Sequence, residues 1–352
     1  MKRSLGIIAL SAVAAVTLAG CTPAADDGGK GESVTLTWET TGGEATEVEK
    51  AAFQDPFTEE TGTAFENVTS STAVSQIQTM VETGNTVWDV VHTGSFVSAR
   101  YCGELFEELD LSAFPDDLFP EGTVNECAKP ISKYASAFAY DSSVYTGDMP
   151  STIEDFFDTD AFPGKRVINA TNPRGVLEAA LVADGVDPDE LFPLDVDRAL
   201  AKLDTIKSDL IFAPSFTAIQ QNIVDKQAAM TITLTGRLAI INESGGTLQP
   251  VWDFTSWDYD ALLIPNGSKH VEDAQKAIEF AMQPEQVIRY AELGGSTPVR
   301  TDVDLSTVKF SENHELFNAF LEDRGTVLLQ DVQWWADNNS SASEAYVAWQ
   351  VG

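Results

Sequence analysis

The sequence predicts an α/β protein with a mostly parallel sheet, and both the order of its segments and its length favour that class. Short apolar segments at 34–38 and 88–94 are typical of buried strands. Segments with helical periodicity lie near Val48, at 73–85 and at 96–109. This strand, helix, strand, helix order is characteristic of sheets whose faces are covered by helices.

A second alternation of the same kind begins after Tyr140. The expected strands are 165–170, 227–236 and 261–265, and the expected helices are 175–186, 195–210, 271–282 and 284–293. About 320 residues follow the N-terminal 33, which is enough for two lobes with hydrophobic cores of their own.

The N-terminus is similar to a bacterial lipoprotein signal. Lys2 and Arg3 precede an apolar stretch at 5–16, and the sequence Leu-Ala-Gly then leads to Cys21. The apolar stretch is shorter than the roughly 20 residues of a membrane span. We expect residues 1–20 to be removed and Cys21 to carry lipid outside the cytoplasmic membrane, although a plain cleaved signal is an alternative.

Residues 21–33 are small and polar, and they are expected to be a flexible tether.

Charge and cysteine content narrow the choice of partners. The chain has 21 Lys+Arg against 55 Asp+Glu, a formal net charge of −34, which argues against nucleic acid. Such acidity weakly favours a cationic ligand, and adaptation to a salty habitat would explain it equally well.

Outside the membrane, Cys102 and Cys127 are expected to form a disulfide.

The sequence does not favour an enzyme or a metalloprotein. His92, His270 and His314 stand apart from any nucleophile or metal-ligand motif. The tyrosines do not occur in adjacent pairs and no calcium-loop pattern is present. We therefore expect no catalysis, no metal and no cofactor.

Several segments together resemble one family. They are 88–110, 154–204, 260–300 and 332–338, the last containing Trp334 and Trp335. The chain resembles the extracellular solute-binding lipoproteins of ABC importers, in particular the spermidine/putrescine-binding branch. The resemblance implies a type II periplasmic-binding-protein fold with a ligand cleft between two lobes. It also implies a monomer that delivers its ligand to permease subunits. Trp334 and Trp335 could either reach the cleft or pack on lobe two, and the helical context around them favours packing.

In such proteins the polypeptide chain crosses between the two lobes more than once. The resemblance implies that 34–139 and 260–305 form lobe one, and that 140–259 and 306–352 form lobe two. The crossovers are then expected near Tyr140, Asp258 to Asp260 and Thr301.

The resemblance also implies the cleft residues. Asp260 would pair with a ligand ammonium group, and neighbouring aromatic faces would attract the same cation. The candidate ligand-binding residues are Trp38, Glu39, Ser95, Phe96, Asn172, Arg174, Arg237, Trp257, Tyr259 and Asp260. For Trp38, Trp257 and Tyr259, packing in the core or at the rim is an open alternative.

The chain departs from the polyamine pattern at several of these positions. It has Asn172 and Gly175 where carboxylates are expected, and Leu234 and Gly295 where aromatic residues are expected. The expected ligand is a small cation such as spermidine or putrescine. The alternative is an amino-acid-like or opine-type zwitterion or anion, held by Arg174 and Arg237.

Overall fold

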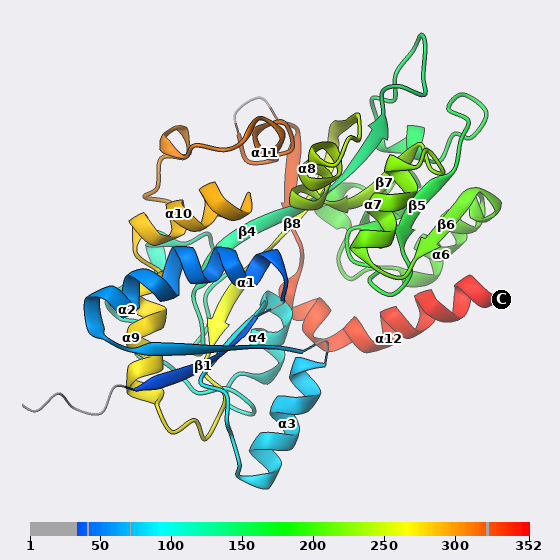
Figure 1. Ribbon diagram of the computed structural model, residues 1–352. Coiled ribbons are helices and arrows are strands. Elements are labelled where there is room, and N and C mark those ends of the chain that lie inside the picture. The colour runs from blue at the N-terminus through cyan, green and yellow to red at the C-terminus, as the bar shows by residue number, and fades with distance from the viewer. Residues whose placement is uncertain (1–33, 41, 71, 322–323) are drawn as a thin grey trace, which may run out of the picture. The chain divides into compact units, whose positions relative to one another are not determined.

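Two long antiparallel strands, β4 (Pro130–Asp141) and β8 (Leu248–Leu263), run through the centre of the fold (Figure 1). This computed structural model describes residues 34–40, 42–70, 72–321 and 324–352. The predicted signal at 1–20, the tether at 21–33 and Cys21 lie outside the described residues.

The strands form one mixed sheet with the order β2-β1-β3-β8-β4-β7-β5-β6, in which β9 pairs with β4 and β10 with β8. The pairs on each flank are parallel, whereas the pairs made by β4 and β8 with β3, β7 and each other are antiparallel. The remaining strands are β1 (Thr35–Thr40), β2 (Ala64–Thr69), β3 (Val90–Gly94), β5 (Arg166–Asn169), β6 (Leu210–Ala213), β7 (Met230–Leu234), β9 (Thr297–Pro298) and β10 (Thr326–Leu329).

Helices cover the sheet, as the alternating pattern predicts. The α-helices of the described residues are α1 (Glu44–Glu49), α2 (Asp55–Thr61), α3 (Ala73–Thr83), α4 (Ser95–Tyr101), α5 (Val176–Ala183), α6 (Val196–Asp204), α7 (Phe216–Val224), α8 (Thr235–Glu243), α9 (Val271–Ala281), α10 (Pro284–Gly294), α11 (Glu312–Leu316) and α12 (Val332–Val351). A π-helical segment, Lys50–Gln54, joins α1 to α2. None of these helices is both long and apolar enough to cross a membrane.

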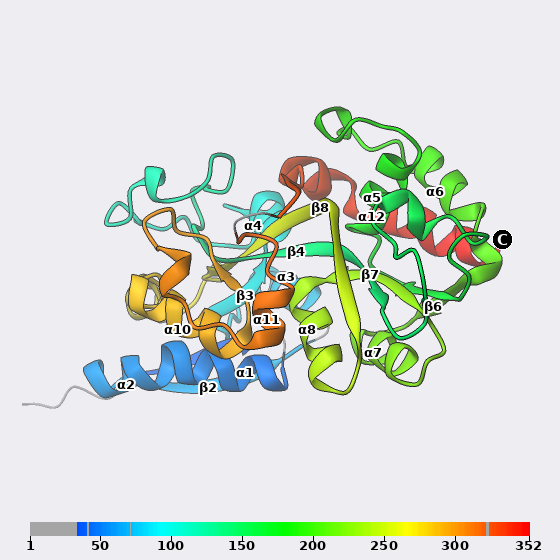
Figure 2. The ribbon, with the colours of Figure 1, turned by 90° about the horizontal axis from the view of Figure 1, so that it is seen from above.

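The largest hydrophobic clusters lie on opposite flanks of the central strands (Figure 2). One cluster includes Trp38, Phe53, Val90, Leu262 and Ile278, and the other includes Phe138, Phe156, Leu177, Leu203 and Trp335. Each cluster is built from segments distant in sequence, which β4 and β8 bring together. The fold is therefore an α/β fold with two lobes.

A register shift marks the passage between the lobes. Ala137 of β4 faces Thr255 of β8, but the next residue, Phe138, faces Val251. β8 thus carries the extra residues 252–254 at this point, which bends the pair of strands. We propose on this basis that the lobes divide near here, with 34–139 plus 260–305 and 140–259 plus 306–352 as their approximate extents.

The predicted helix at 96–109 is too long, because α4 ends at Tyr101. Cys102 leaves the helical region at φ −58° and ψ 133°, and Gly103 follows with φ +73°. Cys102 is joined to Cys127 by a disulfide with 5.6 Å between the Cα atoms, and Cys127 is buried. The chain turns here so that the disulfide can fasten the following loop to lobe one.

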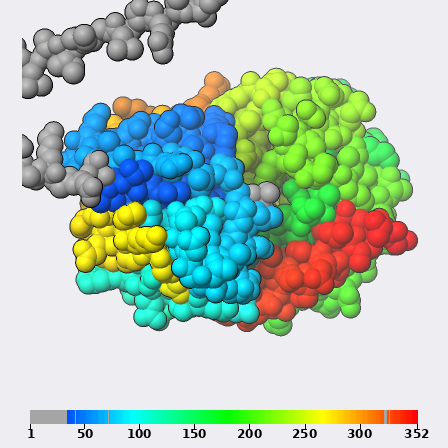
Figure 3. All heavy atoms as spheres, turned by 60° about the horizontal axis from the view of Figure 1, so that its bottom comes forward, coloured from blue at the N-terminus to red at the C-terminus, as the bar shows by residue number. Residues whose placement is uncertain are grey.

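Helix α12 closes lobe two. Figure 3 shows it as a red helix beside the green segments of that lobe, reaching the cyan segments that include α4. Trp335 is 1% exposed and its indole N–H donates to Glu178 at 3.0 Å, while the Tyr346 hydroxyl donates to the carbonyl of Asn169 at 2.7 Å. Trp335 thus packs within lobe two rather than in a cleft.

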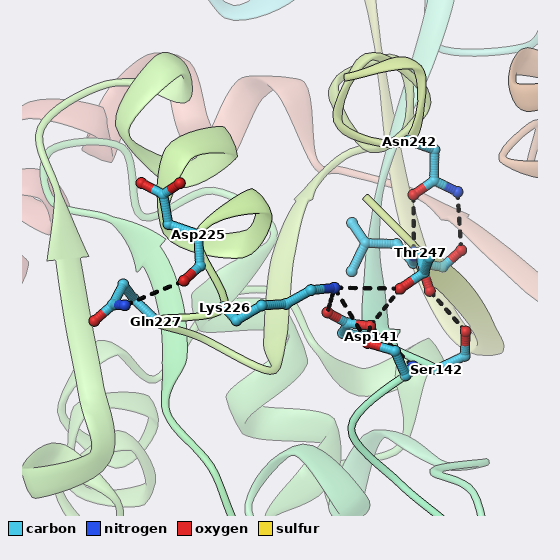
Figure 4. Close-up of polar contacts among 9 residues, drawn as sticks. Asp141, Ser142, Asp225, Lys226, Gln227, Asn242 and Thr247 are labelled. Carbon is cyan, nitrogen blue, oxygen red and sulfur yellow. Dashed lines mark hydrogen bonds and ion pairs between the residues drawn. The ribbon is translucent and has the colours of Figure 1, made fainter. Parts of the chain in front are cut away.

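At the lobe-two end of β4, the buried carboxylate of Asp141 is surrounded by hydrogen-bond donors (Figure 4). Lys226 Nζ lies 2.6 Å from Oδ2, and the hydroxyl groups of Ser143 and Thr247 donate to Oδ1 at 2.7 and 2.5 Å. Burial raises the pKa of Asp141, but these donors outweigh it and lower the pKa to about 2. Lys226 has φ +58°, a conformation that glycine adopts more easily.

We expect Lys226→Met to lower the free energy of unfolding at pH 7 by about 1–2 kcal/mol, a value reduced because the lysine side chain is 45% exposed. The ion pair stabilises the fold above the ordinary pKa of Asp141, 3.8, and this contribution is lost as the pH falls toward 2. Denaturant titrations from pH 7 to pH 3 should show the difference shrinking with acidity.

Lys226→Gly is the matched control, because it removes the same charge and relieves the positive φ. Lys226→Gly should lower the free energy of unfolding by less than Lys226→Met does. Equal stability of Lys226→Met and the unaltered protein at pH 7 would contradict the role of the ion pair.

Candidate functional site

A cavity of about 870 Å³ lies between the two lobes, where the central strands cross. Its lining residues come from strand ends, helix ends and the segment after α11. They include Glu39, Glu44, Ser70, His92, Gly94, Lys133, Tyr134, Phe216, Thr235, Arg237, Asp260, Tyr290, Gly295, Thr297, His314 and Asn318. Three of the sequence-predicted residues, Glu39, Arg237 and Asp260, line this cavity.

A second hollow, of about 970 Å³, lies on lobe one between α2, α9 and α10. Its charged lining residues are Glu59, Glu60, Glu279, Glu285, Lys276 and Arg289. It contains none of the sequence-predicted residues and involves one lobe alone. The cavity between the lobes is therefore the candidate binding site.

His92 joins two carboxylates at the inner wall of the cavity. Its Nδ1 lies 2.8 Å from Glu49 Oε1, and its Nε2 lies 3.6 Å from Asp260 Oδ2. Burial alone would lower the pKa of His92, but Glu49 and then Asp260 raise it well above the ordinary 6.5. His92 is thus an imidazolium at neutral pH, and the three groups together carry one net negative charge next to the cavity.

Trp38 lies behind this group rather than in the cavity. Its side chain is 0% exposed, and its indole N–H donates to Glu49 Oε2 at 2.7 Å. The structure thus places Trp38 in the core of lobe one, which corresponds to the alternative of core packing. Trp38 fixes Glu49, and Glu49 in turn fixes His92.

Asp258 is the most fully bonded carboxylate near the cavity. Arg174 Nη1 donates to Oδ2 at 2.8 Å, the Tyr134 hydroxyl donates to Oδ2 at 3.2 Å, and the Ser95 hydroxyl donates to Oδ1. The backbone N–H of Tyr259 also donates to Oδ1 at 2.8 Å. Arg174 and Ser95 are therefore occupied with Asp258, and neither lines the cavity.

Trp257 and Tyr259 also lie outside the cavity lining, because side chains alternate between the two faces of a strand. Asp258 and Asp260 share one face of β8, and the two aromatic side chains share the other. Tyr259 is 2% exposed, and Trp257 packs edge-on against Phe320 with 5.8 Å between ring centroids. The expected aromatic faces are supplied instead by Tyr134, Tyr290 and Phe216.

Phe96 and Asn172 support Arg174. The guanidinium of Arg174 lies 4.5 Å from the ring centroid of Phe96, which packs against clusters of both lobes. Asn172 Oδ1 accepts a hydrogen bond from the backbone N–H of Arg174 at 3.2 Å. These predicted residues therefore lie together, but next to the Asp258 network rather than in the cavity.

Lys133 is among the residues that line the cavity, but its charge does not share a face with Asp260. On the sheet Lys133 is paired with the neighbour of Asp260, so its side chain lies on the opposite face of the strands. Its Nζ lies 4.4 Å from the ring centroid of Phe320 and 5.9 Å from that of Trp257, and burial lowers the pKa of Lys133 to about 8.

Arg237 also lines the cavity. Its guanidinium lies 5.1 Å from the ring centroid of Phe216 and has no carboxylate of the described residues within 4.0 Å. The charge of Arg237 is therefore available to an anionic group of a ligand.

Sequence reasoning missed Lys133 and Tyr134 because it did not predict β4. Tyr290 was concealed on the buried face of α10, whose apolar residues recur at helical spacing. For His92 there was a signal, namely a histidine near the end of an apolar strand just before Gly94. A histidine in such a place is more often a packed residue, and the structure shows both packing and a place in the cavity wall.

A charged cavity enclosed by two α/β lobes defines a protein that captures a small solute. The chain matches the bacterial extracellular solute-binding protein family over residues 52–318, and it belongs to that family. The two-lobe periplasmic-binding-protein fold is thereby confirmed, and the protein is the substrate-binding component of an ABC transporter. The spermidine/putrescine branch is not specifically supported.

Individual relatives cover nearly the whole chain. A gamma-aminobutyric acid-binding protein of Pseudomonas aeruginosa is 29% identical over 326 residues, 90% of this chain and 91% of that protein. The solved Atu4243-GABA receptor is 30% identical with a TM-score of 0.79, over 90% of this chain and 97% of that one. AgtB from A. tumefaciens R10, solved in complex with agropinic acid, is 25% identical with a TM-score of 0.72, over 91% and 99%.

Glu39 gives a test of the cavity's electrostatics in the empty protein. It is 2% exposed, and burial raises its pKa from 4.5 to about 7 despite a hydrogen bond from the backbone N–H of Ser70. The folded protein therefore holds the proton of Glu39 more tightly than the unfolded chain does. The resulting contribution to the free energy of unfolding is fully present below pH 4.5 and is lost as the pH rises through 7.

Glu39→Gln should therefore raise the free energy of unfolding by about 2–3 kcal/mol at pH 8 and change it little at pH 4.5. Denaturant titration at both pH values measures the difference. Glu66→Gln, on the exposed side of the neighbouring strand β2, is the control and should have no such pH dependence. An effect of Glu39→Gln that is equal at both pH values would refute a buried, titrating Glu39.

Proposed function

We propose that the protein captures a small zwitterion with an ammonium group at one end and a carboxylate at the other, such as γ-aminobutyric acid, for import. The observation that carries the proposal is the charge distribution of the cavity. Asp260 presents a carboxylate that is 26% exposed, and Arg237 presents a cation without a carboxylate of the described residues within 4.0 Å. A zwitterion can pair with both kinds of charge at once.

The relatives support the same choice. Two of the similar proteins are described by their binding of γ-aminobutyric acid, and a third was solved with agropinic acid. The alternative ligand class suggested by the sequence is therefore better supported than a polyamine. The anion-binding residue would be Arg237, because Arg174 is paired with Asp258.

A polyamine such as spermidine would meet a less favourable field. It would bring several positive charges into a cavity that holds the guanidinium of Arg237, and desolvated like charges repel each other strongly. Glu39, Glu44 and Glu243 also line the cavity, so the repulsion acts on those ammonium groups that lie near Arg237. His92 also offsets part of the charge of Asp260, so that one net negative charge remains in that group. This balance suits one ammonium group better than several.

Asp260→Asn should weaken γ-aminobutyric acid binding about 10- to 100-fold, since a charge-assisted pair contributes about 1.5–3 kcal/mol. Isothermal titration calorimetry measures the affinity, and Asp273→Asn, on the outer face of α9, is the matched control. Arg237→Met should weaken binding of the same ligand. If spermidine binds the unaltered protein more tightly than γ-aminobutyric acid, and Arg237→Met strengthens spermidine binding, the polyamine is the ligand and this proposal is wrong.

We also propose that the protein is held at the outer side of the cell membrane by lipid on Cys21 and delivers its ligand to permease subunits there. The Leu-Ala-Gly-Cys ending of the N-terminal signal supports the lipid, and the family supports the transporter.

Cys21→Ser should abolish lipid attachment, so that the protein is either left uncut or released from the membrane fraction. Metabolic labelling with a fatty acid and cell fractionation measure both effects. A Cys21→Ser variant that stays in the membrane fraction after correct cleavage would show that the anchor is not this lipid.

A further inference from the structure

Glu49 is a carboxylate that lies behind the wall of the cavity and does not itself line it. It ends α1 and is fully buried, and a π-helical segment follows it directly, an irregularity that is frequent at functional sites. A carboxylate removed from water is costly unless it is paired and hydrogen-bonded. An apolar side chain would fill this position more favourably if only packing were required there.

Both oxygens of Glu49 are bonded, and through His92 the group reaches Asp260. The indole N–H of Trp38, which can only donate, lies 2.7 Å from Oε2, and His92 Nδ1 lies 2.8 Å from Oε1. On the other edge of the imidazole ring, Nε2 lies 3.6 Å from Asp260 Oδ2 and is buried without a hydrogen-bond partner among the described residues. Both ring nitrogens of His92 therefore face a carboxylate oxygen.

This arrangement favours a doubly protonated ring. Ionised carboxylates accept hydrogen bonds and cannot donate them, and a neutral imidazole has one nitrogen without hydrogen. The lone pair of that nitrogen would point at a negatively charged oxygen, whereas the imidazolium has an N–H group for each carboxylate. Burial opposes the charge, but Glu49 and Asp260 outweigh it and raise the pKa of His92 well above 6.5.

Two further titratable groups lie beside the ring. Tyr290 from α10 stands edge-on to His92 with 6.2 Å between the ring centroids, and burial raises the pKa of this phenol well above its ordinary value, so that it is neutral. Glu39 on β1 gains negative charge as the pH rises through about 7, and that charge favours the imidazolium. Neither group opposes a charged His92.

The two oxygens of Asp260 have different surroundings. Oδ2 faces His92, as described above. Oδ1 lies beside Gly94 in the cavity lining, where an added Cβ would be 3.9 Å from it. The orientation that the His92 N–H group favours thus leaves Oδ1 on the side of the ligand.

Resting on the proposed function, we infer that Glu49 is a positioning residue for ligand binding, which acts through His92 on Asp260. Glu49 holds the imidazolium so that its Nε2–H group points at Oδ2 of Asp260. The negative charge of Glu49 also compensates the positive charge that the ring brings. Asp260 then keeps one orientation, and the three groups keep one net negative charge for the ammonium group of the ligand at any neutral pH.

The test is Glu49→Gln, which keeps the shape of the side chain and removes its charge. The amide oxygen must accept from Trp38, so the amide N–H₂ group meets Nδ1 and His92 can lose its proton at neutral pH. At pH 5.5 the charged ring then cancels Asp260, and calorimetry should show about tenfold weaker binding of γ-aminobutyric acid than by the unaltered protein. At pH 8 the ring is neutral, and the two affinities should agree within about threefold.

Glu47→Gln is the matched control, because Glu47 is an exposed carboxylate of the same helix, paired with Lys50. It should bind as the unaltered protein does at both pH values. γ-Aminobutyric acid stays a zwitterion at both, and comparison at equal pH cancels the titration of Glu39, which all these proteins share. Glu49→Gln combined with His92→Gln has no ring to titrate, so its affinity relative to the unaltered protein should be the same at both pH values.

The nitrogen chemical shifts of the His92 imidazole give a second readout, which needs neither ligand nor variant. In the unaltered protein both nitrogens should carry hydrogen at pH 7. A neutral His92 at that pH contradicts the inference, and so does a Glu49→Gln variant whose relative affinity is the same at pH 5.5 and pH 8; in either case the proposed function stands. If the unaltered protein does not bind γ-aminobutyric acid, the proposed function fails and the inference fails with it.

Discussion

The buried carboxylate of Asp258 holds the site together. It lies on β8 at the crossing between the lobes and is bonded by Ser95 from the start of α4, by Tyr134 from β4 and by Arg174 from the loop before α5. A charge that is removed from water must be paired and hydrogen-bonded, because its desolvation costs several kcal/mol otherwise. Asp258 thus requires elements of both lobes to meet at one point.

The position of Asp258 also explains why Asp260 is free to bind a ligand. The two carboxylates share one face of β8, but Arg174 is bonded to the first and His92 lies 3.6 Å from the second. The imidazolium is held by Glu49, which Trp38 fixes in turn. This face of β8 therefore carries one neutralised carboxylate and one that is only partly offset, and a ligand ammonium group complements the second.

The sequence was sufficient for the class of fold, because the alternating strands and helices follow local periodicity. The resemblance of several segments was sufficient for the solute-binding family but not for its branch. The sequence was insufficient for β4, whose residues are buried almost throughout and include small and polar side chains such as Ser132, Ala135 and Ser136. A strand covered on both faces has no alternation to detect. Without β4, neither Lys133 nor Tyr134 could be placed in the cleft.

The site residues show the same limit. Arg174 and Asp258 are 84 positions apart, and nothing in the local sequence of either indicates that they neutralise each other. For Trp257 and Tyr259 the sequence left packing open as an alternative to ligand contact. Consecutive strand residues point to opposite faces, so Asp258 and Asp260 share one face of β8 and the two aromatic residues share the other. Strand alternation, applied at the level of sequence, would have separated the aromatic residues from the acids.

The titration of Glu39 has a consequence for energetics of uptake. Its pKa of about 7 means that the empty cleft holds a fraction of a proton at neutral pH. A ligand ammonium group bound at Asp260 in the same cavity would favour the charged form of Glu39, so that binding would release part of that proton into the medium. The heat of capture would then contain the ionisation heat of whatever buffer accepts the proton.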